Sequence, residues 1–105
     1  MANKELINSI CEEIGARNIE TLEFITVDGV NYIWNIVESL NTTYGGKYNH
    51  GGNIYAVFQS TKPLFYIRQD FMVIASSYTQ CEFRFYIPYE VEKIQVVKNI
   101  WKVVN

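Results

Sequence analysis

The spacing of apolar residues changes along the chain, and the clearest helical period lies in the last eighteen residues, 88–105. The apolar positions recur every three or four residues, at Val91, Ile94, Val97, Trp101 and Val104. The polar positions lie on the opposite side of a helix: Glu92, Gln95, Lys98, Asn99 and Lys102. One apolar stripe with a period of about 3.6 residues predicts an amphipathic helix that packs on a sheet. Pro88 suits the first position of such a helix.

A second helix is predicted over residues 3–14. Asn3 is a favoured N-cap residue, and Gly15 stands where a residue in the left-handed conformation would close the helix. The apolar face of this helix comprises Leu6, Ile7, Ile10, Cys11 and Ile14. Both ends of the chain are therefore expected to be helical.

A β-hairpin is predicted next, because residues 21–27 and 30–38 are rich in β-branched and aromatic residues and flank Asp28-Gly29. Asp-Gly favours a two-residue type I′ turn. That turn sets the cross-strand pairs Val27 with Val30, Ile25 with Tyr32, and Glu23 with Trp34.

A helix is the alternative for the second arm of this hairpin. Val30, Ile33, Trp34 and Val37 also share one side of a helix, and Asp28 could cap it. The β-branched and aromatic content favours the strand.

Residues 41–53 are rich in Gly, Asn, Thr and Tyr and are predicted to be a loop. Alternating apolar runs then predict strands at residues 54–59, 64–68, 71–77 and 81–87. The turns between them are expected at residues 61–63, 68–70 and 78–80. The fold class is therefore α+β: an antiparallel sheet of about five or six strands, with the N-terminal and C-terminal helices packed on one face.

Length and composition agree with a single domain over residues 1–105. A chain of this length buries roughly two-thirds of its unfolded surface, which is enough for one core. Hydrophobic residues make up 49% of the chain and aromatic residues 15%, a composition typical of a globular protein.

The charge balance argues against a duplex-DNA binder. Nine basic and eleven acidic residues give a formal net charge of −2, whereas DNA binding needs clustered Lys and Arg. The sequence contains neither a signal-peptide pattern nor an apolar run that could span a membrane. Cys11 and Cys81 belong to no metal or redox motif, which is typical of reduced thiols in a cytoplasm.

The loop is the first candidate binding segment. Tyr supplies rigid amphipathic contact area, and Gly lets another backbone approach closely. The glycines do not form a phosphate-binding loop, because Lys47 is not followed by Ser or Thr and a strand follows the loop. The predicted contact residues of the loop are Tyr44, Lys47, Tyr48 and His50. A plain connection is the alternative.

One face of the predicted sheet is the second candidate. Alternation along the strands directs aromatic and Arg side chains away from the helices, a composition typical of protein–protein contact surfaces. The predicted contact residues are Tyr55, Tyr66, Arg68, Arg84 and Tyr86. Single-stranded RNA can also stack on such a face, but the residues around Arg84 lack the Gly spacing of an RNA-binding motif. An ordinary solvated sheet face is the remaining alternative.

No catalytic constellation emerges from the sequence. His50 is the single histidine, and a base needs a nucleophile and an orienting partner close by. Cys81 is the one candidate nucleophile, and a core position is the simpler interpretation of it. One His and two isolated Cys do not make a four-ligand zinc site. We therefore expect a protein that is not an enzyme and carries no metal or cofactor.

The leading hypothesis is a cytoplasmic protein-binding module that occupies the surface of a host or cellular protein. An inhibitor or adaptor encoded by a phage or mobile element fits the size and composition. The alternatives are an oligomeric binder of a small, nucleotide-like molecule and a structural subunit of a larger assembly, and both are compatible with a homo-oligomer.

Overall fold

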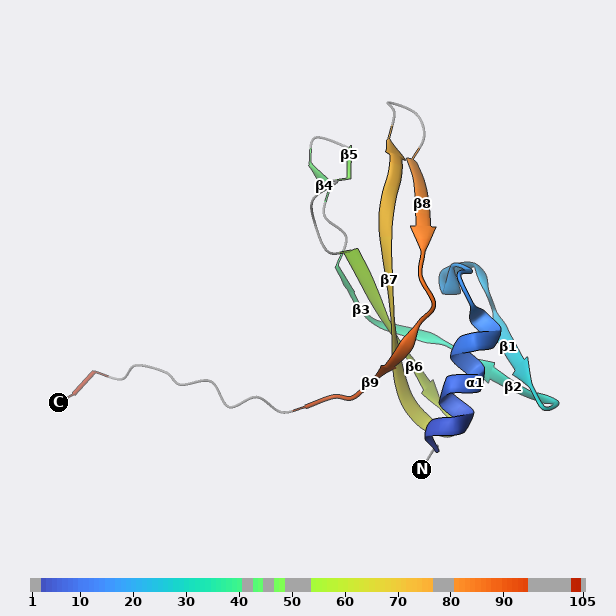
Figure 1. Ribbon diagram of the computed structural model, residues 1–105. Coiled ribbons are helices and arrows are strands. Elements are labelled where there is room, and N and C mark those ends of the chain that lie inside the picture. Colours follow the sequence, from blue (N-terminus) through green and yellow to red (C-terminus); the bar gives the residue numbers. More distant parts are fainter. Residues whose placement is uncertain are drawn as a thin grey trace.

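The computed structural model describes residues 3–40, 43–44, 47–48, 54–76, 81–94 and 103–104 (Figure 1). The helical elements are α1 (Lys4–Ile14) and the 3-10 helix η1 (Ile19–Thr21). The first strands are β1 (Phe24–Val27), β2 (Val30–Ile33), β3 (Asn35–Leu40), β4 (Thr43–Tyr44) and β5 (Lys47–Tyr48). The later strands are β6 (Ile54–Thr61), β7 (Leu64–Ser76), β8 (Cys81–Phe85) and β9 (Tyr89–Val91).

Helix α1 begins and ends as its sequence predicts. The Asn3 side chain accepts a hydrogen bond from the Leu6 amide at 2.7 Å, which satisfies one of the unpaired donors of the first turn. Gly15 has a φ of 60°, and its amide donates to the Cys11 carbonyl at 2.9 Å. The side chains of Ile7, Ile10, Cys11 and Ile14 are buried.

The hairpin of β1 and β2 is also confirmed. Asp28 and Gly29 both have positive φ, at 51° and 78°, as a type I′ turn requires. Val27 pairs with Val30, and Ile25 pairs with Tyr32. Residues 30–33 and 35–40 are strands, so the helical alternative for this segment is wrong. The second arm is shorter than predicted, because residues 35–38 belong to β3, which pairs with β6 rather than with β1.

A five-stranded antiparallel sheet forms the main body of the fold. Its path runs β3–β6–β7–β8, and β9 pairs with β7 as well. Strand β8 pairs with the second half of β7, from Phe71 to Ser76, whereas β9 pairs with Tyr66 to Arg68. The two short strands therefore share one edge of the long strand.

Strand β7 corrects the prediction of a turn at residues 68–70. All three residues pair with β6: Arg68 with Val57, Gln69 with Ala56, and Asp70 with Tyr55. The polar triplet resembles a turn in sequence, but each of its side chains has a partner in the folded sheet. Arg68 and Asp70 form an ion pair on one face at 2.8 Å, and Gln69 is buried on the other.

The C-terminal helix is not shown, and its predicted start is wrong. Residues 89–91 form strand β9 because they pair with the part of β7 that β8 leaves open. Residues 92–94 and 103–104 have no regular secondary structure. The remaining positions of the predicted helix, including Trp101, lie outside the described residues. One α-helix, rather than two, accompanies the sheets in the part that the structure describes.

The segment predicted as a loop contains two short strands, β4 and β5, which pair with each other. The turn predicted at residues 61–63 is present as Lys62-Pro63, between β6 and β7. The turn predicted at residues 78–80 lies outside the described residues.

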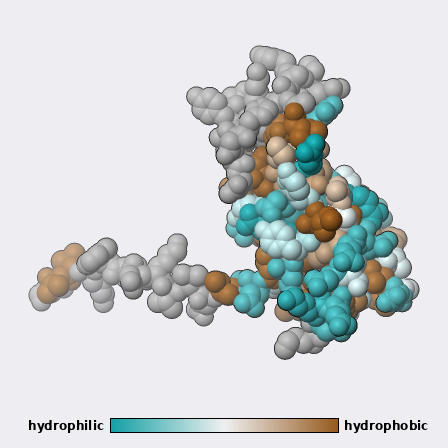
Figure 2. Space-filling model, viewed as in Figure 1, coloured by the Kyte–Doolittle hydropathy of each residue, from teal (hydrophilic) through white to brown (hydrophobic). Residues whose placement is uncertain are grey.

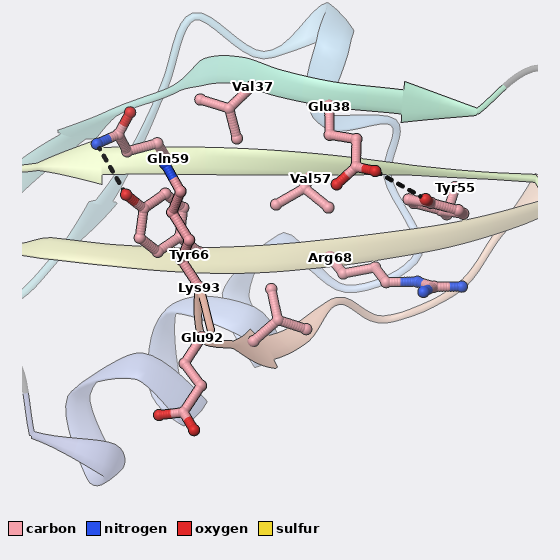
Figure 3. Close-up of a pocket in the computed structure, with 10 residues that line it drawn as sticks. Val37, Glu38, Tyr55, Val57, Gln59, Tyr66, Arg68, Glu92 and Lys93 are labelled. Carbon is pink, nitrogen blue, oxygen red and sulfur yellow. Dashed lines mark hydrogen bonds between the residues drawn. The ribbon is translucent and has the colours of Figure 1, made fainter. Parts of the chain in front are cut away.

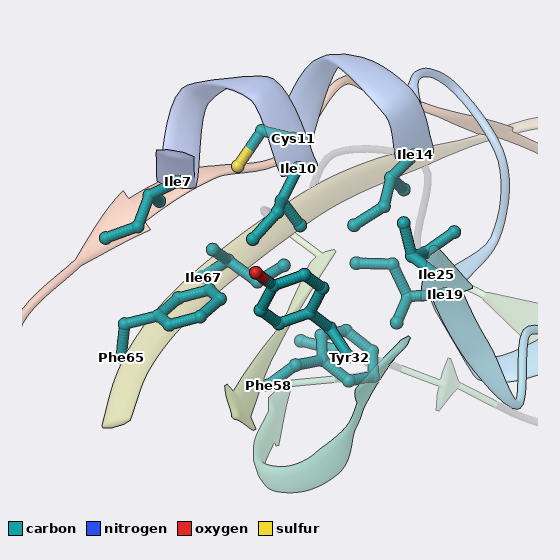
Figure 4. Packing of buried hydrophobic residues seen from close by; sticks show 11 residues of the cluster. Ile7, Ile10, Cys11, Ile14, Ile19, Ile25, Tyr32, Phe58, Phe65 and Ile67 are labelled. Atoms are coloured by element: carbon teal, nitrogen blue, oxygen red, sulfur yellow. The ribbon is translucent and has the colours of Figure 1, made fainter. Parts of the chain in front are cut away.

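The core lies between α1, the hairpin and one face of the sheet (Figure 4). Ile10 and Ile14 of α1 and Ile67 of β7 have 0% exposure. The Tyr32 and Trp34 rings meet Phe65 edge-on, with ring centroids 6.4 and 5.9 Å away. Hydrophobic side chains also gather on the surface over β7 and β8, beyond the end of the helix (Figure 2). The helix therefore covers only part of the sheet.

Candidate functional site

Alternation along β6 and β7 gives the sheet two distinct faces. The inner face, toward α1, carries the buried residues Phe58, Phe65 and Ile67. The outer face carries the intervening residues of the same strands, which are only half-buried: Tyr55, Val57, Gln59, Tyr66, Arg68 and Asp70. The described helices pack on the inner face, so the outer face has no helical cover among the described residues.

A shallow depression of about 490 Å³, here called the outer hollow, crosses the outer face (Figure 3). It extends from β3 across β6 and β7 to β9 and the two residues that follow. Its lining consists of Val37, Glu38, Tyr55, Val57, Gln59, Tyr66, Arg68, Val91, Glu92 and Lys93.

A β-bulge helps to shape the outer hollow. Ile36 pairs with Phe58 and Glu38 pairs with Val57, so Val37 is the extra residue of β3. A bulge places two successive residues against one partner and redirects their side chains. Both Val37 and Glu38 consequently line the outer hollow.

Polar contacts fix the side chains at one end of the outer hollow. The Tyr55 hydroxyl donates to Glu38 Oε1 at 3.0 Å, and this hydrogen bond to the carboxylate raises the pKa of Tyr55. The Arg68 guanidinium carbon lies 3.9 Å from the centroid of the Tyr55 ring, within the range of a cation–π contact. Arg68 Nε and Nη2 donate to Asp70 Oδ1 at 3.0 and 2.8 Å.

Tyr89 extends this polar group to β9. It pairs directly with Arg68 across the strands, so the two residues lie on the same face. Burial raises the pKa of Tyr89, and its hydrogen bond with Asp70 raises it further. The phenol groups of Tyr55 and Tyr89 therefore stay protonated at neutral pH and remain hydrogen-bond donors.

Three of the predicted contact residues meet in the outer hollow: Tyr55, Tyr66 and Arg68. Gln59 Nε2 approaches the Tyr66 hydroxyl at 3.5 Å, near the limit of a hydrogen bond (Figure 3). Alternation predicts that Tyr55, Tyr66 and Arg68 share one face, and the structure brings them to one hollow.

Arg84 and Tyr86 do not line the outer hollow. Arg84 lies on β8 opposite Met72, and the Tyr86 hydroxyl donates to Met72 Sδ at 2.8 Å. Both residues belong to the exposed surface beside the second half of β7.

Three of the four predicted loop contacts lie in short strands. The backbone of Tyr44 forms part of β4, and the backbones of Lys47 and Tyr48 form β5. His50 lies outside the described residues.

Sequence reasoning missed four residues of the polar group and its rim: Val37, Glu38, Asp70 and Tyr89. The sequence pattern predicts a turn at Asp70 and a helix at Tyr89, whereas both residues lie in strands. In a regular strand Glu38 would share a face with Ile36, two residues before it. The bulge that brings Val37 and Glu38 together to the outer hollow has no signal in the sequence. The pair Arg68 and Asp70, two residues apart, could have indicated a strand with an ion pair on one face.

The buried thiol has the character of a core residue. Burial raises the pKa of Cys11 to about 11, and the nearby Glu90 and Glu12 carboxylates add to this effect. A thiol with such a pKa stays protonated at neutral pH and is a poor nucleophile. No group of three or more His, Cys, Asp and Glu side chains suited to a metal ion occurs among the described residues.

Comparison with known protein families, with curated proteins and with solved structures found no match to this chain. Within the described part of the chain, no helix has the length and apolar character needed to cross a membrane.

Proposed function

We propose that this protein is a non-enzymatic protein-binding module that uses the outer face of its sheet to occupy the surface of a partner protein. The observation that carries the proposal is the group formed by Tyr55 and Arg68, which line the open outer hollow, and Asp70 beside them, on a face without helical cover among the described residues. Their mutual contacts hold these side chains in place before a partner arrives, which lowers the entropy cost of binding.

The composition of this face supports a protein partner. Tyr and Arg are enriched at the centres of protein interfaces, whereas Lys is depleted there. Two tyrosines and one arginine line the hollow, and Lys93, which follows β9, is the one lysine among its lining residues. A cytoplasmic host or cellular protein remains the proposed partner, and an inhibitor or adaptor from a phage or mobile element the proposed biological role.

Two double variants of the same composition test the proposal. Tyr66→Ser with Arg68→Ala removes two lining side chains of the outer hollow. Tyr86→Ser with Arg84→Ala removes the same residue types from the sheet outside the hollow. Capture of partners from a lysate, quantified by mass spectrometry, should fall about tenfold or more for the first variant only.

The melting temperature of both double variants provides the control for folding. Equal capture by both variants would contradict a role for the outer hollow. A failure of the wild-type protein to retain any partner above the level of an unrelated protein would contradict the function itself.

A small-molecule ligand is the second candidate function, and the dimensions of the outer hollow favour it. A volume of about 490 Å³ lies within the roughly 300–1,000 Å³ of typical ligand sites. A nucleotide that binds the folded protein must raise its melting temperature. A rise with micromolar AMP, ADP or ATP that is lost in Arg68→Ala would favour this function over the first.

A further inference from the structure

Strand β3 lies at the edge of the sheet and offers one side of its backbone for pairing. It pairs with β6, and no other described strand pairs with it. All six of its residues are exposed. An edge strand with unpaired N–H and C=O groups is a template on which an extended segment can add another strand.

A second depression, here called the inner hollow, lies beside β3 on the other face of the sheet. Its volume is about 230 Å³. Its lining is largely apolar and consists of Ile19, Glu20, Leu22, Trp34, Ile36 and Phe58. The edge of β3 therefore has the inner hollow on one face and the Val37 side of the outer hollow on the other.

This arrangement suits an added strand because successive side chains of a strand point to opposite faces. Side chains of the added strand that lie beside Ile36 would enter the inner hollow. Those that lie beside Glu38 would lie at the outer hollow. An added strand would cover three apolar side chains of β3 that are exposed to solvent: Ile36 is 50% exposed, Val37 49% and Leu40 44%.

Trp34 gives the inner hollow a further feature of a contact site. Its Nε1 atom is buried and has no hydrogen-bond partner. An unpaired buried donor destabilises a fold, and a hydrogen-bond acceptor on an incoming segment could satisfy it. The ring itself packs edge-on against Phe65, so it forms a firm wall for an incoming apolar side chain.

The charges beside β3 determine the chemistry of the incoming segment. Glu38 lies on the outer side of the edge, and Glu20 lines the inner hollow. No Lys or Arg lines the inner hollow. On the outer face Arg68 is paired with Asp70, and Lys93 follows β9, which β6 and β7 separate from β3. Glu38 and Glu20 therefore give the β3 edge its negative charge, while the cations of the outer hollow, Arg68 and Lys93, come from β7 and from the residues after β9.

We propose that the open edge of β3 binds an extended segment of the protein partner in which apolar and basic residues alternate. The apolar side chains enter the inner hollow, and a Lys or Arg lies opposite Glu38. This inference rests on the proposed protein-binding function and names the part of the partner that the module recognises. The bulge at Val37 interrupts regular pairing, so the side chains must supply much of the affinity, and we expect micromolar binding.

A synthetic peptide of four Val-Lys repeats, labelled with a fluorophore, is the probe. Fluorescence anisotropy should show saturable binding, whereas a peptide with four Val followed by four Lys should bind at least about tenfold more weakly. Two backbone-methylated versions sharpen the test, one methylated on the Val amides and one on the Lys amides. Alternate amides of a strand point to opposite edges, so only one of the two versions should lose binding, by about tenfold or more.

Charge reversal locates the binding site on the protein. Glu38→Lys should lower the affinity for the Val-Lys peptide about tenfold and should allow a Val-Glu peptide to bind instead. Glu12→Lys makes the same change on the exposed side of α1 and should have no effect. Melting temperatures show whether both variants are folded.

Three results would overturn the inference. Equal effects of the two methylation patterns would show that the peptide does not add as a strand. Absence of binding by every peptide would show that the edge does not accept this chemistry. A dimer in analytical ultracentrifugation that Glu38→Lys dissociates would show that a second copy of the chain occupies the edge.

Failure of this inference differs from failure of the proposed function. If the peptides do not bind but lysate capture still requires Tyr66 and Arg68, the module binds by its outer face alone. If the peptides bind at β3 but capture is insensitive to the outer-face variant, the proposed outer-face function is wrong.

Discussion

The inner and outer faces of the sheet use the same strands for different purposes. On the inner face, Phe65 and Ile67 of β7 are buried against α1 and the hairpin. On the outer face, Tyr66 and Arg68 of the same strand remain half-buried and line an open hollow. Residues that alternate along one strand therefore divide between the core and the proposed binding face.

Two glutamines illustrate this difference. Gln69, 2% exposed, has three backbone partners: its Nε2 donates to the carbonyls of Arg17 and Tyr86 at 2.6 and 3.1 Å, and its Oε1 accepts from the Ile19 amide at 3.2 Å. Gln59 on the outer face has one long contact, 3.5 Å from Tyr66. The buried amide of Gln69 joins three segments of the chain. The half-buried amide of Gln59 keeps most of its donors and acceptors open to solvent.

The largest expected effect follows from truncation on the inner face. Ile67→Ala should lower the free energy of unfolding by about 2–5 kcal/mol, because it removes a fully buried side chain and leaves a cavity. Met72→Ala, on the outer side of the same strand and 40% exposed, should cost less than about 1 kcal/mol. Urea denaturation measures both. Similar losses would show that side chains on the two faces contribute equally to the free energy of unfolding.

The two glutamines provide the next comparison. Gln69→Leu should cost about 1–3 kcal/mol, because it leaves the Ile19 amide and two carbonyls without their partner in a buried position. Gln59→Leu should change the free energy of unfolding by less than about 0.5 kcal/mol. Urea denaturation measures both variants. A larger loss of unfolding free energy in Gln59→Leu than in Gln69→Leu would contradict this account.

Cys11 makes the inner face sensitive to alkaline pH. Its pKa of about 11 in the folded protein lies above the ordinary value of 9.0, so the unfolded chain loses the thiol proton first. The contribution of the protonated thiol to stability is therefore complete below pH 9 and declines between pH 9 and 11. Urea denaturation at several pH values should show that the free energy of unfolding declines more steeply between pH 9 and 11 in wild type than in Cys11→Ala. Parallel profiles would refute a buried, protonated thiol.

The smallest effect is expected on the outer face. Arg68→Ala breaks a partly exposed ion pair and should lower the free energy of unfolding by less than about 1 kcal/mol. Thermal unfolding at low and high salt should show that even this difference shrinks as salt screens the charges. A loss of several kcal/mol would place Arg68 among the structural residues and remove it from the proposed binding site.

Local patterns in the sequence predicted the local structures correctly. Helix α1 has its own cap at Asn3 and its own stop at Gly15, and the hairpin has its own turn at Asp28-Gly29. Alternation also assigned Tyr55, Tyr66 and Arg68 to one face. Each of these features depends on residues close together in the chain, so the sequence contains the whole signal.

The errors concern residues whose conformation depends on distant partners. Gln69 is polar and looked like part of a turn, but residues 17, 19 and 86 satisfy its amide inside the fold. Residues 89–91 have helical spacing, but the open edge of β7 at Tyr66 to Arg68 makes them a strand. Tertiary hydrogen bonds outweighed the local preference in both cases.

The sequence by itself determined the α+β class, the first helix, the hairpin and the division of the sheet into an apolar and a polar face. These properties follow from capping, turn chemistry and the two-residue period of a strand. Only the tertiary structure decided the continuity of β7, the pairing of β9 and the meeting of Glu38, Tyr55 and Arg68 in the outer hollow. The reason is physical: strand partners, bulges and buried polar contacts join residues far apart in the chain, and their energies exist only when the sheet is assembled.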